Sequence, residues 1–364
     1  MTSTTNPEFL VSSSQLEIAD TRLQKSRRLK NVGDPLQLPG KALAIEVIGN
    51  DAWIAENTTV ARKIDLVVDS RQILITGAWD NTKELISSTD AHLDFVKSLL
   101  VIPSVNLLVS GSSDKIIRFW HLSAKQQPLQ SAGSLSSHTR PVECLAGQVL
   151  PDGNVELCTG DTMGIIRLWT LTNDDGRWTT SLKTEFNHHR TKISDLHLGF
   201  GQLWTASADE TVQVRNLLDA PGKRTPPPIT HSKDVRCLLP LYLTDLREPY
   251  IVTGSGDFLR VYDVSTVEEP ELLNQVESHW HDVTHIRLWM RQSTDENNQR
   301  KVEPWIVSTS LDATVRRWRL SDLLAPQPKS KVTAPSAPPQ AEPESRFIMT
   351  AEEAQELDDL LDSD

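Results

Sequence analysis

Histidine is the side chain with the widest chemical range in this sequence, because imidazole can bind a metal ion, move a proton or hold a hydrogen bond. Five of the ten histidines recur in one pattern, in which Val or Ile follows four residues after the His and Leu or Ile three residues later. The copies begin at His92, His138, His189, His231 and His279. A histidine repeated in the same setting every ~40–50 residues favours a structural hydrogen-bonding role in each copy over a single reactive centre.

Other candidates for catalysis or metal binding are weak. The densest histidine cluster is HWHDVTH at 279–285, where His281 and His285 would share one face of a strand and Asp282 would point to the other. Asp174 and Asp175 lie in NDDGRW, which is typical of a hairpin turn. The sequence contains no glycine-rich phosphate loop, no Gly-x-Ser-x-Gly and no Cys-x-x-Cys. We therefore expect no catalytic residue, no metal ligand and no cofactor.

The elements that position the histidines are short strands. After each His pattern comes a strand of small residues, a turn with an acid and a branched strand that ends in an aromatic residue, as in LLVSGSSDKIIRFWHL at 107–122 and WIVSTSLDATVRRWRL at 305–320. Val, Ile and Thr alternate with a period of two, and helical periodicity is absent. These segments predict an all-β repeat protein.

Taken together, these motifs resemble the WD-repeat family over about residues 41–320. The resemblance implies a β-propeller, in which four-stranded blades surround a central channel. It also implies a hydrogen-bond chain in each blade from His through Ser or Thr and Asp to Trp. Two copies carry every member: His92, Ser110, Asp114 and Trp120, and His279, Ser308, Asp312 and Trp318. Three copies depart from it, with Met163 at the acid position, Arg215 at the Trp position and Tyr262 one residue early, and we expect those blades to be less rigid.

The number of blades is open from the sequence. Five units end at positions 120, 169, 215, 262 and 318, and a sixth upstream unit covers 52–66. Between them, ILITGAWDNTKEL at 73–85 has the strand and turn signature but lacks both a His pattern before it and a strand after it. We expect a seven-bladed design with a truncated second blade. The alternative is a six-bladed propeller in which 67–90 is an elaborated loop. The polar stretch 291–304 is expected to be a surface loop.

Four regions are expected along the chain. Residues 1–40 form a polar extension with a basic cluster at 22–31, which is either a nuclear-import or acidic-surface contact or simply a solvated face. The propeller spans 41–324, a Pro-rich linker 325–345 and an acidic amphipathic helix 346–364. That last helix either docks on a partner or is a solubilising tail.

Composition restricts the class of function. The formal net charge is −12, which does not favour direct contact with nucleic acid. Three cysteines point to a reducing compartment, and no apolar stretch is long enough for a signal peptide or a membrane span. A cytoplasmic or nuclear location is expected.

A non-catalytic scaffold or adaptor that binds proteins within a multisubunit complex fits best. The alternatives are a reader of peptides or small molecules at the channel mouth and, less favoured, a propeller hydrolase. Loop residues beside the pattern histidines are the predicted protein contacts: Asp94, Phe95, Arg140, Lys192, Asp234 and Trp280. In the C-terminal helix the predicted contacts are Leu357, Leu360 and Leu361.

Overall fold

The computed structural model describes residues 13–57, 61–67, 71–74, 92–122, 130–218, 225–294 and 300–325. All of them belong to one compact unit, Met1–Pro326. The predicted linker beyond Ala325 and the predicted C-terminal helix, with Leu357, Leu360 and Leu361, lie outside the described residues.

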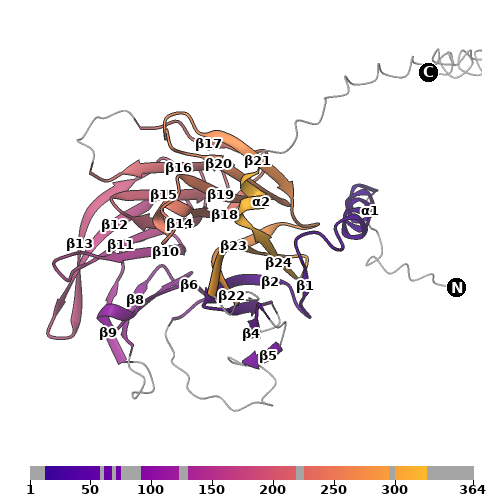
Figure 1. The fold of residues 1–364 in the computed structure, drawn as a ribbon. Coiled ribbons are helices and arrows are strands. Elements are labelled where there is room, and N and C mark those ends of the chain that lie inside the picture. Colours follow the sequence, from indigo (N-terminus) through magenta and orange to yellow (C-terminus); the bar gives the residue numbers. More distant parts are fainter. Residues whose placement is uncertain are drawn as a thin grey trace, which may run out of the picture. The chain divides into compact units, whose positions relative to one another are not determined.

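Within the described residues the strands form six antiparallel sheets of four strands each, the blades of a propeller (Figure 1). Blade 1 contains β2 (Ala42–Ile48), β3 (Asp51–Glu56), β4 (Ala61–Asp65) and β5 (Arg71–Leu74). Blade 2 contains β6 (Val96–Ile102), β7 (Leu107–Ser112), β8 (Ile117–His121) and β9 (Gln130–Leu135). Blade 3 contains β10 (Val142–Val149), β11 (Val155–Asp161), β12 (Ile166–Asp174) and β13 (Arg177–Phe186). Blade 4 contains β14 (Ile193–Gly199), β15 (Gln202–Ser207), β16 (Thr211–Asn216) and β17 (Ile229–Thr230).

The last two blades complete the series. Blade 5 contains β18 (Val235–Pro240), β19 (Tyr250–Ser255), β20 (Phe258–Asp263) and β21 (Glu271–Glu277). Blade 6 contains β22 (Val283–Thr294), β23 (Arg300–Ser310), β24 (Thr314–Arg319) and, as its outer strand, β1 (Leu36–Gln37). Leu36 pairs with Val315, so the N-terminal part of the chain, upstream of the boundary expected at residue 41, completes the last blade.

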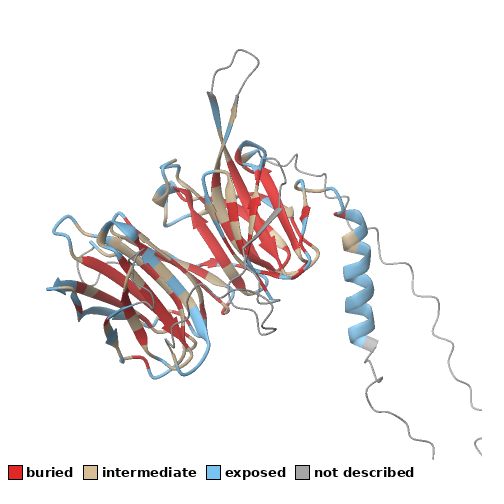
Figure 2. Cartoon of the chain, turned by 90° about the horizontal axis from the view of Figure 1, so that it is seen from below, coloured by how far each residue is buried: buried red, intermediate tan, exposed pale blue. Residues whose placement is uncertain are grey.

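Helices are few among the described residues. Helix α1 (Ser13–Arg28) precedes β1, and the short α2 (Leu320–Leu324) follows β24. Two 3-10 turns, η2 (Pro103–Val105) and η3 (Leu241–Leu243), follow β6 and β18. Figure 2 shows α1 almost entirely exposed, while buried residues are concentrated in the sheets.

The core lies between neighbouring blades. On the face of blade 3 that meets blade 4, Cys144 and Cys158 pack against Ile193. A side-chain carbon on Gly160 would lie only 2.8 Å from the Cys144 sulfur and 3.0 Å from Ile193, so only glycine fits there. Burial raises the pKa of the Cys144 and Cys158 thiols, as expected for small core residues that do not ionise. Blade 3 is thus packed against the face of blade 4.

The prediction of an all-β propeller is confirmed, and the described residues contain the six blades of the alternative count. Ile73 and Leu74, the first residues of the truncated second unit, form the end of β5 and pair with β4. The rest of that unit, from residue 75 to residue 85, lies outside the described residues.

Two local expectations can be compared with the structure. NDDGRW forms a tight hairpin between β12 and β13, in which Asp175 and Gly176 have φ of +46° and +85°. The stretch 291–304 was expected to be a surface loop, but β22 extends into it as far as Thr294 and β23 begins at Arg300, with Arg291 paired to Glu303. Residues 295–299 lie outside the described residues. Cross-strand neighbours such as Ser293 and Lys301, and the ion pair of Lys301 with Glu303 along β23, allow a polar sequence to extend a hairpin beyond the core.

Candidate functional site

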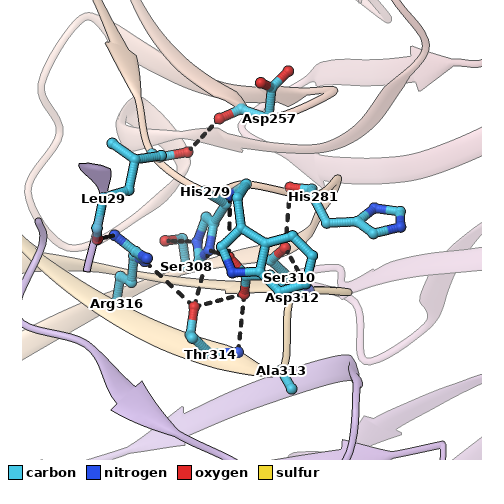
Figure 3. Close-up of polar contacts among 12 residues, drawn as sticks. Leu29, Asp257, His279, His281, Ser308, Ser310, Asp312, Ala313, Thr314 and Arg316 are labelled. Carbon is cyan, nitrogen blue, oxygen red and sulfur yellow. Dashed lines mark hydrogen bonds and ion pairs between the residues drawn. The ribbon is translucent and has the colours of Figure 1, made fainter. Parts of the chain in front are cut away.

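The hydrogen-bond network of blade 6 connects the loop before β22 to β23 and β24 (Figure 3). Ser308 Oγ lies 2.9 Å from both His279 Nε2 and Trp318 Nε1, and His279 Nδ1 lies 2.9 Å from Asp312 Oδ2. The indole N–H can only donate, so Ser308 accepts from Trp318 and gives its own proton to His279 Nε2. His279 must then carry its proton on Nδ1 and donate it to Asp312. The donor or acceptor role of each side-chain atom in these three hydrogen bonds is therefore defined.

This arrangement determines the electrostatics of the site. His279 is fully buried, and burial lowers its pKa. Burial would raise the pKa of Asp312, but His279, Thr314 and Arg316 together outweigh this effect, and the pKa is lowered. A neutral histidine and an ionised aspartate are therefore the stable pair. With both ring nitrogens engaged, His279 has no lone pair for a metal ion or a substrate proton.

Blade 2 has the same geometry. His92 Nε2 lies 2.7 Å from Ser110 Oγ, and its Nδ1 lies 2.9 Å from Asp114 Oδ2. Trp120 Nε1 donates to Ser110 Oγ at 2.9 Å. In both blades that carry every member of the motif, the four side chains are therefore joined.

Blade 3 corrects one expectation. The sequence interpretation placed Met163 at the acid position, but Asp161 Oδ2 lies 3.2 Å from His138 Nδ1. Thr159 Oγ1 completes the chain, at 2.7 Å from His138 Nε2 and 3.1 Å from Trp169 Nε1. Asp161 lies two residues earlier than the acids of other blades. Its second oxygen accepts from the N–H groups of Met163 and Ile165, so the turn still closes around a carboxylate.

Blades 4 and 5 contain shorter networks. In blade 4, His189 contacts Thr205 at 2.7 Å and Asp209 at 3.1 Å, and Arg215 occupies the Trp position. In blade 5, His231 Nε2 lies 2.9 Å from Thr253 Oγ1, with the hydroxyl of Tyr262 at 3.4 Å.

Asp257, the acid of blade 5, is used differently. It forms ion pairs with Lys25 of helix α1 and with Lys233, the latter at 3.1 Å. Lys25 also contacts Glu277 at 2.9 Å, and Arg28 pairs with the same glutamate. The basic cluster at 22–31 thus attaches α1 to acids of the propeller. Contact with an acidic surface was one of the alternatives for this cluster, but the acids of the same chain were not identified, because a basic cluster carries no signal of the acids it will meet.

The six predicted contact residues of the propeller lie on or beside the entry loops, which we define as the loops that lead into the inner strands β6, β10, β14, β18 and β22. All blades share one strand order, so these loops lie on one side of the ring. Asp94, Phe95, Arg140 and Lys192 are exposed, whereas Asp234 and Trp280 are half-buried. Trp280 donates its backbone N–H to Asp312 at 3.3 Å.

Ion pairs join the entry-loop side of adjacent blades. Lys192 contacts Glu143 of blade 3 at 2.7 Å. Arg236 of blade 5 bridges Asp234 at 2.9 Å and Asp282, before β22, at 3.0 Å. The entry loops therefore form a charged surface. The histidine networks hold these loops to the strands of their own blades.

A group of charged residues on the inner strands was not predicted. Asp195 and His197 of β14 lie 3.5 Å apart, and Asp195 accepts the Leu238 N–H at 3.0 Å. Burial would raise the pKa of Asp195, but His197 and Arg287 lower it to about 2. Arg287 also contacts Glu46 at 2.9 Å. Within the described ranges, no group of three or more His, Cys, Asp or Glu side chains is placed to hold a metal ion.

Two clefts lie at the outer parts of blades. One of about 730 Å³ lies between β9 and the β12–β13 hairpin and is lined by Ser134, Asp174 and Trp178, among others. The other, of about 450 Å³, lies beside α2 and contacts Trp305 and Trp318. Neither is lined by entry-loop residues. For the part of the chain that the structure describes, no helix is long and apolar enough to cross a membrane.

Comparison with known proteins agrees with this architecture. The family model described as WD domain, G-beta repeat matches residues 83–121. An uncharacterized WD repeat-containing protein of Schizosaccharomyces pombe is 28% identical over 304 residues, which cover 79% of this chain and 71% of that protein. The Ribosome biogenesis protein WDR12 homolog of Dictyostelium discoideum is 23% identical over 316 residues, which cover 74% of this chain and 63% of that protein. The chain thus spans slightly less than two thirds of the second relative.

Proposed function

Because the chain belongs to the WD-repeat β-propeller family, we propose that it is a non-catalytic scaffold that binds protein partners within a larger assembly. The observation that carries this proposal is the use of the pattern histidines. His92, His138 and His279 each have both ring nitrogens in a network that runs to a Trp inside their own blade. Their ring nitrogens are used in hydrogen bonds that hold the entry loops. The exposed side chains of these loops can then contact a partner protein.

The entry loops have the side chains that a protein interface needs. Phe95 is 77% exposed at the start of β6, next to the exposed Asp94. Arg140 and Lys192 supply positive charge on the neighbouring loops. An exposed aromatic residue with arginine nearby is the usual composition of a binding hot spot. We propose that these residues, with Asp234 and Trp280, contact one partner.

The relatives support the scaffold class. The Dictyostelium protein is named for ribosome biogenesis, a process carried out by large assemblies, which supports membership of a multisubunit complex and a nuclear or cytoplasmic location. We propose that the acidic segment 346–364 provides a second contact through Leu357, Leu360 and Leu361. Two contacts on one chain would increase avidity if both partners belong to one complex.

The test is recovery of partners with full-length tagged protein from its own cells. The variant Phe95→Ser with Arg140→Glu is compared with Leu182→Ser, an exposed leucine on the outer strand β13. We expect the first variant to lose a partner at least tenfold and Leu182→Ser to retain it. A third variant, with Leu357, Leu360 and Leu361 changed to Ser, tests the second contact. Equal recovery by all variants would contradict the proposal.

A further inference from the structure

Blade 2 leaves a row of apolar side chains uncovered. Val96 of β6 is 46% exposed and Leu99 is 65% exposed. These are the two apolar positions of the repeated His pattern. In the other copies the first position is completely buried in every case, at Val142, Ile193, Val235 and Val283. The second position is buried at Leu196, Leu238 and Ile286. Leu145, the second position in blade 3, is partly buried. Among the five copies, blade 2 is thus the one in which both positions are exposed.

The other blades show what normally covers this row. The space above Gly111 of blade 2 is filled by Val142 and Leu145 of blade 3. The space above Gly254 of blade 5 is filled in the same way by Val283 of blade 6. The apolar row of each blade therefore packs on small residues of the blade that precedes it. What would cover Val96 and Leu99 is a sheet with small side chains on one face.

No described blade takes that place. The inner strands contact one another extensively in the order β6, β10, β14, β18, β22 and β2, and no contact of similar extent joins β2 to β6 within the described residues (Figure 1). The facing side of blade 1 is also uncovered. In its sheet, Ala55 of β3 occupies the position that Gly160 occupies in blade 3, and Ala55 is exposed. The residues at the same position in blades 4 and 6, Ala206 and Thr309, are completely buried.

We propose that the uncovered face of blade 2, formed by Val96, Leu99 and Val101, is a docking site for a small β-sheet of a partner protein, which packs there as an added blade. The proposal rests on the scaffold function proposed above and names a second mode of binding for it. A solvated sheet face is normally polar, whereas a contiguous apolar row marks a surface that is covered in the working assembly.

The length of the stretch between blades 1 and 2 argues that this stretch does not supply the sheet. A complete blade extends over residues 142–186 or 235–277. Only residues 75–91 lie outside the described residues between β5 and His92, which is less than half of either span. Four strands cannot be built from so few residues, because a strand and its turn need about eight to twelve. A partner that contributes at least a hairpin supplies the missing length.

The packing in other blades also defines the chemistry of this partner. Its docking face should have Gly, Ala, Cys or Thr opposite Val96 and Leu99, as Cys144, Cys158 and Gly160 are opposite Ile193. Along each strand of the partner, side chains should point alternately to the docking face and to the opposite face of the sheet. At the rim, the exposed Leu93 and Phe95 extend the apolar surface onto the entry loop.

The experiment is photo-crosslinking of the full chain in its own cells, with benzoyl-phenylalanine at position 99. Position 182 is the matched control, because Leu182 is an exposed leucine on an outer strand. We expect crosslinks from position 99 to map to one segment of one partner with two runs of alternating residues. Mapping to residues 75–91, to the C-terminal segment, to a second copy or to a helical segment would overturn the proposal, as would a yield no higher than at position 182.

A binding measurement with the mapped segment completes the test. We expect Leu99→Asp to weaken its binding to the purified full chain at least tenfold and Leu182→Asp to change it less than twofold. Both residues are exposed, so neither variant should shift the thermal midpoint. Equal binding by the two variants would overturn the proposal. A crosslinker at position 140 separates this outcome from the scaffold function: crosslinks from 140 without any from 99 contradict only the added blade, and their absence from both contradicts both proposals.

Discussion

The carboxylate of Asp257 forms an ion pair with Lys25, a residue 232 positions away in the sequence on helix α1. In blades 4 and 6 the corresponding acids, Asp209 and Asp312, accept hydrogen bonds from the histidine of their own blade. In blade 5 the acid at this position, Asp257, therefore binds helix α1. Ion pairs of both Lys25 and Arg28 with Glu277 support the same attachment.

Replacement of Lys25 by Ala should release α1 while the propeller stays folded. The ion pair is partly shielded from solvent, with the Lys25 side chain 25% exposed, so its loss should cost about 1 kcal/mol. Hydrogen exchange of the amides of residues 13–28 should then accelerate about fivefold. Lys30→Ala is the control, because Lys30 is exposed just beyond the helix. Equal exchange in both variants would show that α1 is held by other contacts.

The hydroxyl at the centre of each network should matter more where a Trp is present. Thr159 and Thr253 are both completely buried, and Val would preserve their shape. Thr159→Val leaves His138 Nε2 and the Trp169 N–H without their partner, so we expect a loss of about 3 kcal/mol in the free energy of unfolding. In Thr253→Val, the Tyr262 hydroxyl remains near His231, and the loss should be about 1 kcal/mol. Chemical denaturation of both variants measures the difference, and equal losses would contradict this ranking.

These networks also show how far the sequence could predict the structure. The repeated pattern predicted the blades because each copy obeys the same alternation and packs on the next. It could not predict that Val96 and Leu99 are exposed, since their own sequence is the same as in the buried copies and only the neighbouring blade differs. Asp161 was missed because a turn can place its acid two residues earlier and still reach the histidine. The pairing of Lys25 with Asp257 has no periodic signal at all.

Acid should destabilise the propeller well above the pH at which carboxylates protonate. His231 is buried, and burial lowers its pKa from 6.5 to about 4. Burial lowers the pKa of His279 as well. The unfolded chain takes up these protons near pH 6.5 while the folded chain does not, so the free energy of unfolding falls as the pH drops from about 6.5 to about 4. His231 alone should account for on the order of 2 kcal/mol between pH 7 and pH 5.

Urea denaturation at pH 7, 6 and 5 tests this sign. The variant His231→Gln should be less stable at pH 7 but should lose less stability on acidification than the original chain. The carboxylates with lowered pKa, such as Asp312, are ionised throughout this window and add no slope until the pH approaches 4. Stability that stays constant from pH 7 to pH 5 would show that these histidines are not held neutral by burial.

The open side of the ring predicts different effects on stability when the side chain is enlarged at two positions of the same register. Gly160 faces blade 4, where a new carbon would lie 2.8 Å from the Cys144 sulfur and 3.0 Å from Ile193. Gly160→Ala should therefore reduce the free energy of unfolding by about 1–3 kcal/mol, because the blades must move apart. Ala55 has the same place in blade 1 but is exposed, so Ala55→Val should change stability by less than about 0.5 kcal/mol. Thermal and urea unfolding of the purified chain provide both values. A comparable loss in Ala55→Val would mean that this face is already covered in the isolated protein, and the added blade would then have no place to bind.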